Sequence, residues 1–324
     1  MFSLFLTHLD AQTNLILNGD FEEYYSCPDA MTQIERCKHV TNPLQHAFNT
    51  PFASTSDYFH GCYVPGSSME PVGVPNTVYG LQYPRSGEGM VGFATSNYGN
   101  GSYNEYFQLS FVSPLICGET YNFSIYFNLA NNWKHSRKGL AFYFSTSEFQ
   151  DLSDYLYNLH EPNFVENATL ISDTAEWTQV TFDFVADRPY KFVSIGFTES
   201  TEDMFIEVNS LGQVIGNGTY FFADDASLTG LGKNVQDEFQ LPNVFTPNGD
   251  GINDLFTPIG NSSMFEELIV FNRWGNEVAR LTDTFIWDGI SMGKEMSEGV
   301  YFYILKPNVG CENLTKQGMI HLIR

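Results

Sequence analysis

Apolar and polar residues alternate in many short runs of this sequence, and this pattern is the strongest limit on its fold. In the clearest run, the residues that point to one side are Tyr121, Phe123, Ile125, Phe127 and Leu129. A period of two residues is that of a β-strand with one buried face. Similar runs predict strands at 107–111, 140–144, 180–184, 192–197, 204–208 and 220–228. Because no helical pattern separates these runs, the sequence predicts an all-β sandwich rather than an α/β sheet.

The composition favours packed domains and excludes some partners. The chain has 324 residues, of which 43% are hydrophobic and 16% aromatic, and this is enough for two cores. Its formal net charge is −23. We expect no nucleic-acid partner, because the sequence holds no basic stripe to neutralise phosphates. No run approaches the roughly 18 apolar residues of a membrane span, so no transmembrane segment is expected.

Residues 1–11 contain a short apolar run that ends at a small residue, Ala11. This pattern is typical of the end of a secretory signal peptide, although the basic N-terminal region is missing. We interpret these residues as the remnant of such a signal, with an ordinary first strand as the alternative.

The odd number of cysteines leaves at least one unpaired. The five are Cys27, Cys37, Cys62, Cys117 and Cys311. Their spacings are too long and irregular for a zinc site, and paired cysteines of an exported protein form disulfides. Four of them precede residue 118 and allow three pairings. We predict a Cys27–Cys62 disulfide and expect Cys311 to be unpaired or simply packed.

The C-terminal segment 241–324 contains an ordered set of short motifs. They are Leu241–Asp254, Phe271–Asn276, Trp287–Gly289, Glu298–Tyr303 and Gly318–Arg324. The predicted strand around Tyr303 carries apolar residues on both of its faces, so we expect both faces to be largely covered. Several short strands that end at Gly and Asn turns predict a small immunoglobulin-like β-sandwich.

This set of motifs resembles the C-terminal sorting domain of gliding-motility-associated proteins, the type B signal of the type IX secretion system. The resemblance implies export across the outer membrane, to a secreted or cell-surface location. It implies recognition by the outer-membrane secretion translocon and a shuttle protein. The matching residues are expected to fold the signal rather than contact a partner directly. They are Pro247, Asn248, Gly249, Asp250, Gly251, Asp254, Trp274, Gly275, Gly299, Tyr301 and Arg324.

The preceding part resembles galactose-binding-like jelly rolls, the fold of many carbohydrate-binding modules. The resemblance rests on Asn14–Glu22 at its start and Tyr220–Leu228 at its end. We therefore predict a jelly-roll β-sandwich at 12–231, a linker at 232–240, and the smaller immunoglobulin-like β-sandwich at 241–324. The linker is polar, contains glycine and lacks strand alternation.

The jelly-roll resemblance also implies a structural calcium ion (Ca2+) near the terminal strands. The ligands carried over are Glu22, Asp224, Asp225 and Asp20, with solvated strand-end acids as the alternative. The Asn248–Asp254 segment has a spacing similar to that of a calcium loop. We favour a turn without an ion there, because Asn, Gly and Asp adopt turn dihedrals intrinsically.

No catalytic motif is present, so we predict a protein that is not an enzyme. A sugar site needs exposed aromatic rings beside amides and carboxylates, and Trp133, Tyr98 and Tyr103 are the predicted ligand-binding residues. The alternative is that these rings only cap the sandwich, while Trp177 is assigned to the core. The predicted function is binding of a glycan or surface ligand outside the cell. The alternative function is a structural or adhesive component of a gliding or attachment apparatus, acting through protein–protein contacts.

Overall fold

The computed structural model divides into two compact units. It describes residues 13–43, 55–66, 71–97, 102–148, 164–198, 204–210, 212, 217–234, 239–260 and 262–324. Unit 1 contains Met1–Ser113, Tyr121–Asp183 and Lys191–Gly230. Unit 2 contains Pro114–Thr120, Phe184–Tyr190 and Leu231–Arg324. The predicted signal-peptide remnant 1–11 and Tyr98 lie outside the described residues.

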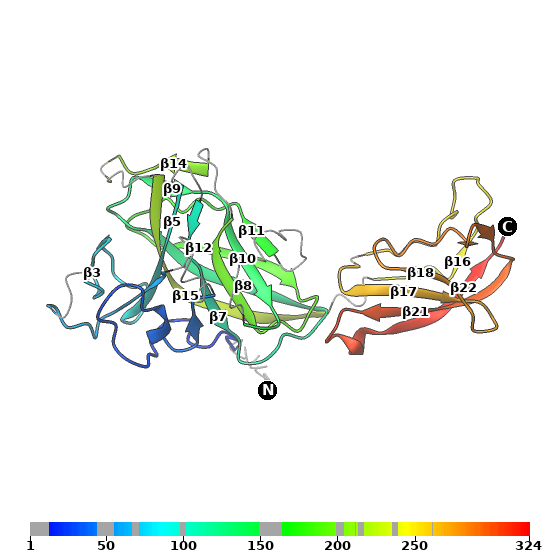
Figure 1. Cartoon of the computed structure of the whole chain (residues 1–324), viewed down its shortest axis with the longest axis horizontal. Coiled ribbons are helices and arrows are strands. Elements are labelled where there is room, and N and C mark those ends of the chain that lie inside the picture. The colour runs from blue at the N-terminus through cyan, green and yellow to red at the C-terminus, as the bar shows by residue number, and fades with distance from the viewer. Residues whose placement is uncertain are drawn as a thin grey trace, which may run out of the picture. The chain divides into compact units, whose positions relative to one another are not determined.

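Unit 1 is a sandwich of two sheets (Figure 1). The five-stranded sheet has the order β1 (Val40–Thr41), β7 (Phe107–Ser110), β13 (Phe192–Phe197), β10 (Leu140–Ser145) and β11 (Phe164–Asn167). The other sheet has the order β12 (Thr178–Val185), β8 (Glu119–Leu129), β15 (Asn217–Asn234), β5 (Gly89–Asn97) and β2 (Asp57–His60), and β6 (Ser102–Asn104) pairs with β5. Two small hairpins add β3 (Asn76–Thr77) with β4 (Gly80–Leu81), and β9 (His135–Arg137) with β14 (Phe205–Glu207).

Consecutive long strands of unit 1 alternate between the two sheets. Strands β5, β8, β12 and β15 belong to the six-stranded sheet, while β7, β10 and β13 belong to the five-stranded sheet. The last strand, β15, lies between β5 and β8. This crossing pattern is that of a jelly roll. The predicted fold class is confirmed, and the described part of the chain contains no α-helix.

Phenylalanine rings fill the space between the two sheets. The Phe93 ring lies 5.4 Å from Phe107 and 5.8 Å from Phe197, measured between centroids. All three side chains are fully buried. Burial of each ring stabilises the fold by roughly 1.5–3 kcal/mol. The alternation along each strand thus directs one face to this core and leaves the other face for a site.

Unit 2 is built on one five-stranded sheet (Figure 1). Its order is β16 (Val244–Phe245), β22 (Lys316–Leu322), β21 (Gly299–Pro307), β17 (Phe265–Phe271) and β18 (Glu277–Leu281). A short hairpin is formed by β19 (Ile290–Ser291) and β20 (Lys294–Glu295). The core face of the sheet packs against Trp287 and Phe256, which pair through an isolated bridge.

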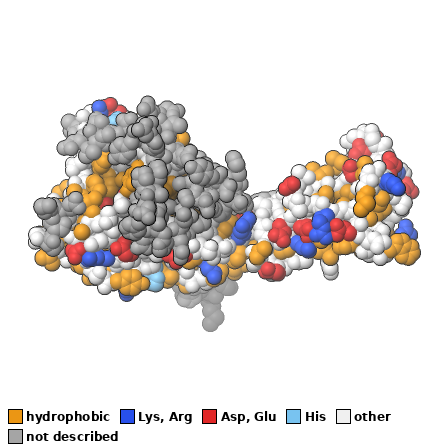
Figure 2. Space-filling view, in the orientation of Figure 1, with side chains coloured by type: hydrophobic (Ala, Val, Ile, Leu, Met, Phe, Trp, Pro, Cys, Tyr) orange, Lys and Arg blue, Asp and Glu red, His pale blue; other side chains and the backbone are white. Residues whose placement is uncertain are grey.

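The opposite face of the unit 2 sheet is partly open. Phe302 on β21 is 46% exposed, so this face is not largely covered as the sequence predicted. Glu267 lies here between two cations, Arg280 and Lys306, and its carboxylate is 2.7 Å from the lysine nitrogen. Figure 2 shows acidic and basic side chains side by side on unit 2. Such exposed ion pairs contribute at most about 1 kcal/mol each.

The structure contains two disulfides. The predicted Cys27–Cys62 bond is confirmed, with an S–S distance of 2.08 Å. The prediction for Cys311 was wrong, because Cys311 bonds to Cys117. The free cysteine is Cys37, which is fully buried.

The junction between the units differs in detail from the predicted linker 232–240. Strand β15 continues to Asn234, so the first part of that segment is strand. Unit 2 begins its C-terminal part at Leu231, and it also includes two earlier segments, Pro114–Thr120 and Phe184–Tyr190.

Candidate ligand-binding site

A cavity of about 460 Å³ lies over the outer face of the six-stranded sheet in unit 1. Alternation along β8 explains its lining, because Phe123 and Ile125 point into the core while Ser124 and Tyr126 point out. On the neighbouring strand β12, Gln179 points to the same cavity. The sheet therefore presents hydroxyl, amide and phenol groups together on an open face.

Arg85 is one of the residues that line this cavity. Its guanidinium carbon lies 3.6 Å from the centroid of the Tyr126 ring, in a cation–π contact. The same guanidinium forms an ion pair with Asp225 on β15, and 38% of the Arg85 side chain is exposed. The Arg85 guanidinium is thus held by Tyr126 and Asp225, while part of the side chain remains exposed to solvent.

The turn that carries Arg85 is held by two carboxylates, the buried Asp224 and the half-buried Glu22. Asp224 is fully buried and accepts hydrogen bonds from the Arg85 amide at 2.7 Å and the Ser86 amide at 3.2 Å. Burial raises the pKa of Asp224 to about 8. Glu22 accepts the Glu88 and Gly89 amides, both at 2.8 Å. These bonds to backbone amides fix the turn, and the turn fixes the position of the Arg85 backbone.

A second cavity, of about 400 Å³, is also lined by Arg85. Its aromatic lining comes from Tyr83, which is 65% exposed, and from the half-buried Trp177. The Trp177 indole donates to the Tyr83 carbonyl oxygen at 3.3 Å. Asn131 donates to the Leu81 carbonyl oxygen at 2.9 Å and fixes the strand before Tyr83. Because both cavities share Arg85, we treat them as one site, the Arg85 groove.

The calcium prediction receives no support from this geometry. Oxygens of Glu22 and Asp224 are bonded to backbone amides, and Asp225 faces a guanidinium, which would repel a cation. Asp20 is exposed on the rim of the groove. Among the described residues, no group of three or more His, Cys, Asp or Glu side chains forms a metal cluster. Carboxylate oxygens of Glu22, Asp224 and Asp225 thus already have protein partners, and calcium binding stays a prediction.

Trp133 does not offer a ring to a ligand. It is 8% exposed and belongs to a hydrophobic cluster with Phe59 and Val72. Tyr79 covers it at a ring distance of 6.4 Å. Its assignment to a ligand-binding face is corrected. Trp177, assigned to the core, is half-buried: it packs against the same cluster and also lines the groove.

Tyr103 belongs to a buried hydrogen-bond network outside the Arg85 groove. Its hydroxyl donates to Glu105 at 2.6 Å and lies 2.7 Å from the Thr55 hydroxyl. The Ala94 amide donates to the other Glu105 oxygen at 2.6 Å. Burial raises the pKa of both Tyr103 and Glu105. The structure thus gives Tyr103 a structural partner rather than a place in the groove.

The network predicts a specific pH dependence. The raised pKa means that folded Glu105 retains a proton which the unfolded chain releases above its ordinary value of 4.5. Stability from the neutral carboxyl is present below that value and falls as the pH rises through and above it. Glu105→Gln removes the titration. Its amide oxygen can accept the Ala94 amide while its NH2 group donates to the Tyr103 and Thr55 hydroxyls, which then accept instead of donating. The stability of unit 1 in this variant, measured by hydrogen exchange in increasing urea, should rise relative to that of wild type from about pH 4.5 upward. If the stability of the variant and that of wild type changed with pH in parallel, this prediction would be contradicted.

The Asn248–Asp254 segment forms a turn that is closed by its own side chains. The Gly249 and Gly251 amides each donate to the Asp254 carboxylate at 2.8 Å, and these bonds lower its pKa. Asn248 accepts the Asp250 amide at 3.0 Å. Both glycines have positive φ, near +80°, which side chains rarely adopt. These bonds close the turn from within, and the absence of an ion there stays a prediction.

The other sorting-signal residues have different environments. The Tyr301 hydroxyl donates to the Ser297 carbonyl oxygen at 2.7 Å, and the Arg324 amide donates to Glu298 at 2.7 Å. Gly275 and Gly299 have positive φ. Pro247 accepts from the Arg324 side chain at 3.4 Å. Trp274 is 80% exposed, so the structure gives it no packing role.

The sequence contained some signals for the groove. Tyr126 stands on the polar face of the clearest strand, where a large ring is exceptional. Arg85 and Tyr83 could not be found in this way, because they lie in a turn without periodicity.

A comparison with known protein families identifies a secretion signal in the C-terminal part of the chain. Residues 239–322 match the CHU_C Type IX secretion signal domain. The chain therefore carries a type IX secretion signal, which implies interaction with the secretion machinery and export across the outer membrane to the cell surface or beyond. In the described residues, no helix has the length and apolar character needed to cross a membrane. No curated protein matches the chain.

Several solved structures are similar to this chain. TmCBM61 in complex with beta-1,4-galactotriose has 13% identity and a TM-score of 0.30, and the match covers 67% of this chain and 99% of that one. A putative sugar binding protein from Bacteroides thetaiotaomicron has 9% identity and a TM-score of 0.33, with 67% and 100% covered. A cleaved adhesin domain of Lys-gingipain from Porphyromonas gingivalis has 14% identity and a TM-score of 0.26, with 55% and 84% covered. At these scores the likenesses carry no argument about ligand or activity.

Proposed function

We propose that this protein is a non-catalytic glycan-binding protein of the cell surface or extracellular space, and that the Arg85 groove binds the glycan. One arrangement carries the proposal: a guanidinium over an aromatic ring, between two cavities lined by polar groups. Sugars present hydroxyl groups and apolar ring faces together. The hydroxyls match Arg85, Asp225 and Gln179, and the ring faces match the exposed Tyr83.

The charges of the groove favour a neutral glycan over an acidic one. The larger cavity is lined by Asp20, Glu23 and Asp225 against a single cation, Arg85. Arg85 is already neutralised by its ion pair with Asp225. The chain as a whole carries a net charge of −23. An anionic polysaccharide would be repelled within about 8 Å of this surface at physiological salt.

Substitutions in the groove should weaken glycan binding without unfolding the protein. We expect Tyr83→Ala to weaken the affinity for a neutral oligosaccharide about tenfold, or about 1.4 kcal/mol. Arg85→Ala should weaken it at least as much, because it removes both the cation–π contact and the hydrogen-bond donors. The full chain is first screened on a glycan array, and the best ligand is then titrated by calorimetry.

Tyr25→Ala is the matched control, because Tyr25 is 70% exposed and lines neither cavity. It should bind like wild type. Equal affinity of wild type, Tyr83→Ala and Arg85→Ala would rule out the groove as the binding site. Tighter binding to polygalacturonate than to neutral chains would rule out the charge argument. If no glycan on the array bound and light scattering showed self-association, the result would favour the alternative function, a structural or adhesive component that acts through protein–protein contacts.

A further inference from the structure

Unit 2 is not made from the C-terminal part of the chain alone. The secretion-signal match covers residues 239–322. The compact unit also includes Pro114–Thr120 and Phe184–Tyr190. Pro114–Thr120 joins β7 to β8, and Phe184–Tyr190 joins β12 to β13. Two segments that the family match does not cover are therefore built into the unit that carries the signal.

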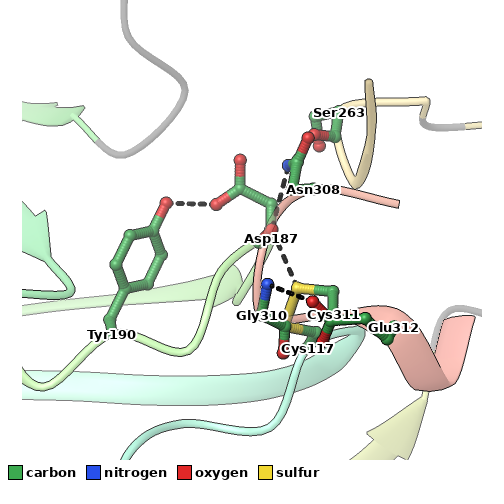
Figure 3. The surroundings of a disulfide bond; sticks show 8 residues. All are labelled: Cys117, Asp187, Tyr190, Ser263, Asn308, Gly310, Cys311 and Glu312. Atoms are coloured by element: carbon green, nitrogen blue, oxygen red, sulfur yellow. Dashed lines mark hydrogen bonds between the residues drawn. A yellow bond between two sulfur atoms is a disulfide. The ribbon is translucent and has the colours of Figure 1, made fainter. Parts of the chain in front are cut away.

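A disulfide joins the first of these segments to the matched region (Figure 3). Cys117 and Cys311 are 194 positions apart in the sequence, and both are almost fully buried. They share one hydrophobic cluster with core residues of the signal, including Phe265 and Leu305. The bond is thus an internal part of this core rather than a surface link.

A buried amide fixes the second segment. Asn308 is 8% exposed, and its Nδ2 group donates to the carbonyl oxygens of Asp187 at 3.0 Å and Ser263 at 2.8 Å. The Asp187 carboxylate accepts the Tyr190 hydroxyl, as Figure 3 shows. One side chain of the matched region therefore bonds to Phe184–Tyr190 and to its own unit at the same time.

Backbone contacts complete the arrangement. The two segments bond to each other, because the Gly118 amide donates to the Ala186 carbonyl oxygen at 2.8 Å. Next to the disulfide, Gly310 has a φ of +90°, and a Cβ atom there would lie 2.6 Å from Pro189 Cγ. Only glycine allows this close approach without strain. A disulfide, a buried hydrogen bond and close packing thus join these two segments to the matched region.

We propose that Pro114–Thr120 and Phe184–Tyr190 are parts of the secretion signal, with Cys117, Asp187 and Asn308 as its positioning residues. Both segments take their positions from strands that pair only when the jelly roll forms. The signal is therefore complete only in a chain whose N-terminal part has folded, and export selects folded cargo. The proposal rests on the family match and on unit 2, so the outcome of glycan binding does not bear on it.

The test compares two disulfides in the full chain. The double variant Cys117→Ser, Cys311→Ser should lower the secreted fraction several-fold, with the remainder retained in the periplasm. The matched control is Cys27→Ser, Cys62→Ser, which removes the other disulfide, and it should be secreted like wild type. Asn308→Asp keeps the disulfide but sets a carboxylate against two carbonyl oxygens, and it should also be retained.

Hydrogen exchange of the retained periplasmic protein supplies the second readout. In the Cys117/Cys311 and Asn308 variants, we expect lost protection within 239–322 and unchanged protection in β8 and β10. Wild-type secretion of both variants would overturn the proposal. Equal retention of a Cys27/Cys62 control whose strands β8 and β10 keep wild-type protection would also overturn it, because the effect would then be a general consequence of disulfide loss.

Discussion

A chain that ends at Gln240 is expected to accumulate in the periplasm, with secretion reduced to the background of the assay. The truncation removes almost all of the segment that matches the type IX secretion signal domain. It removes all five strands of the unit 2 sheet. No remaining segment of unit 2 can then form a core. Immunoblots of medium, surface and periplasmic fractions measure the effect.

The control for the truncation is full-length Arg85→Ala, whose change lies in unit 1. It should be secreted like wild type, because the groove has no part in the signal. Secretion of the truncated chain at the wild-type level would show that 241–324 does not direct export. Loss of secretion in Arg85→Ala would instead show that the assay reports general instability of the chain.

Strand positions were the most predictable feature of this protein. The alternation at 120–129 and 192–197 depends on local sequence, and β8 and β13 occupy these positions. The fold class follows from such runs, because each strand needs a partner for its apolar face. The same local signal also placed Tyr126 on the outer face of its sheet, where it contacts Arg85.

The binding residues were less predictable, because exposure is not a local property. Trp133 stands in a loop-like segment rich in Asn and Lys, which predicts an exposed ring. In the fold, Val72 and Tyr79 come from distant positions and cover it. The Cys117–Cys311 bond was missed for the same reason, since its partners are 194 positions apart. Spacing along the chain carries no information about such a pairing.

Two tryptophans of the secretion signal should respond very differently to substitution. Trp287 is 2% exposed, and its ring lies 5.3 Å from Phe245 and 5.1 Å from Tyr301. Its indole donates to the Ile290 carbonyl oxygen at 3.1 Å. Trp287→Ala leaves a large cavity and removes the hydrogen bond to Ile290, so unit 2 should lose about 3–5 kcal/mol of its free energy of unfolding.

Trp274→Ala is the matched control, because this ring is 80% exposed and the Asn272 side chain already fixes its turn. Its stability should stay within about 0.5 kcal/mol of wild type. Hydrogen exchange resolved along the chain in increasing urea is the right measurement, since a chain with two units has no single two-state transition. Equal destabilisation by both substitutions would mean that the Trp274 ring packs in solution. A stable Trp287→Ala variant would mean that the unit 2 core does not depend on the Trp287 ring.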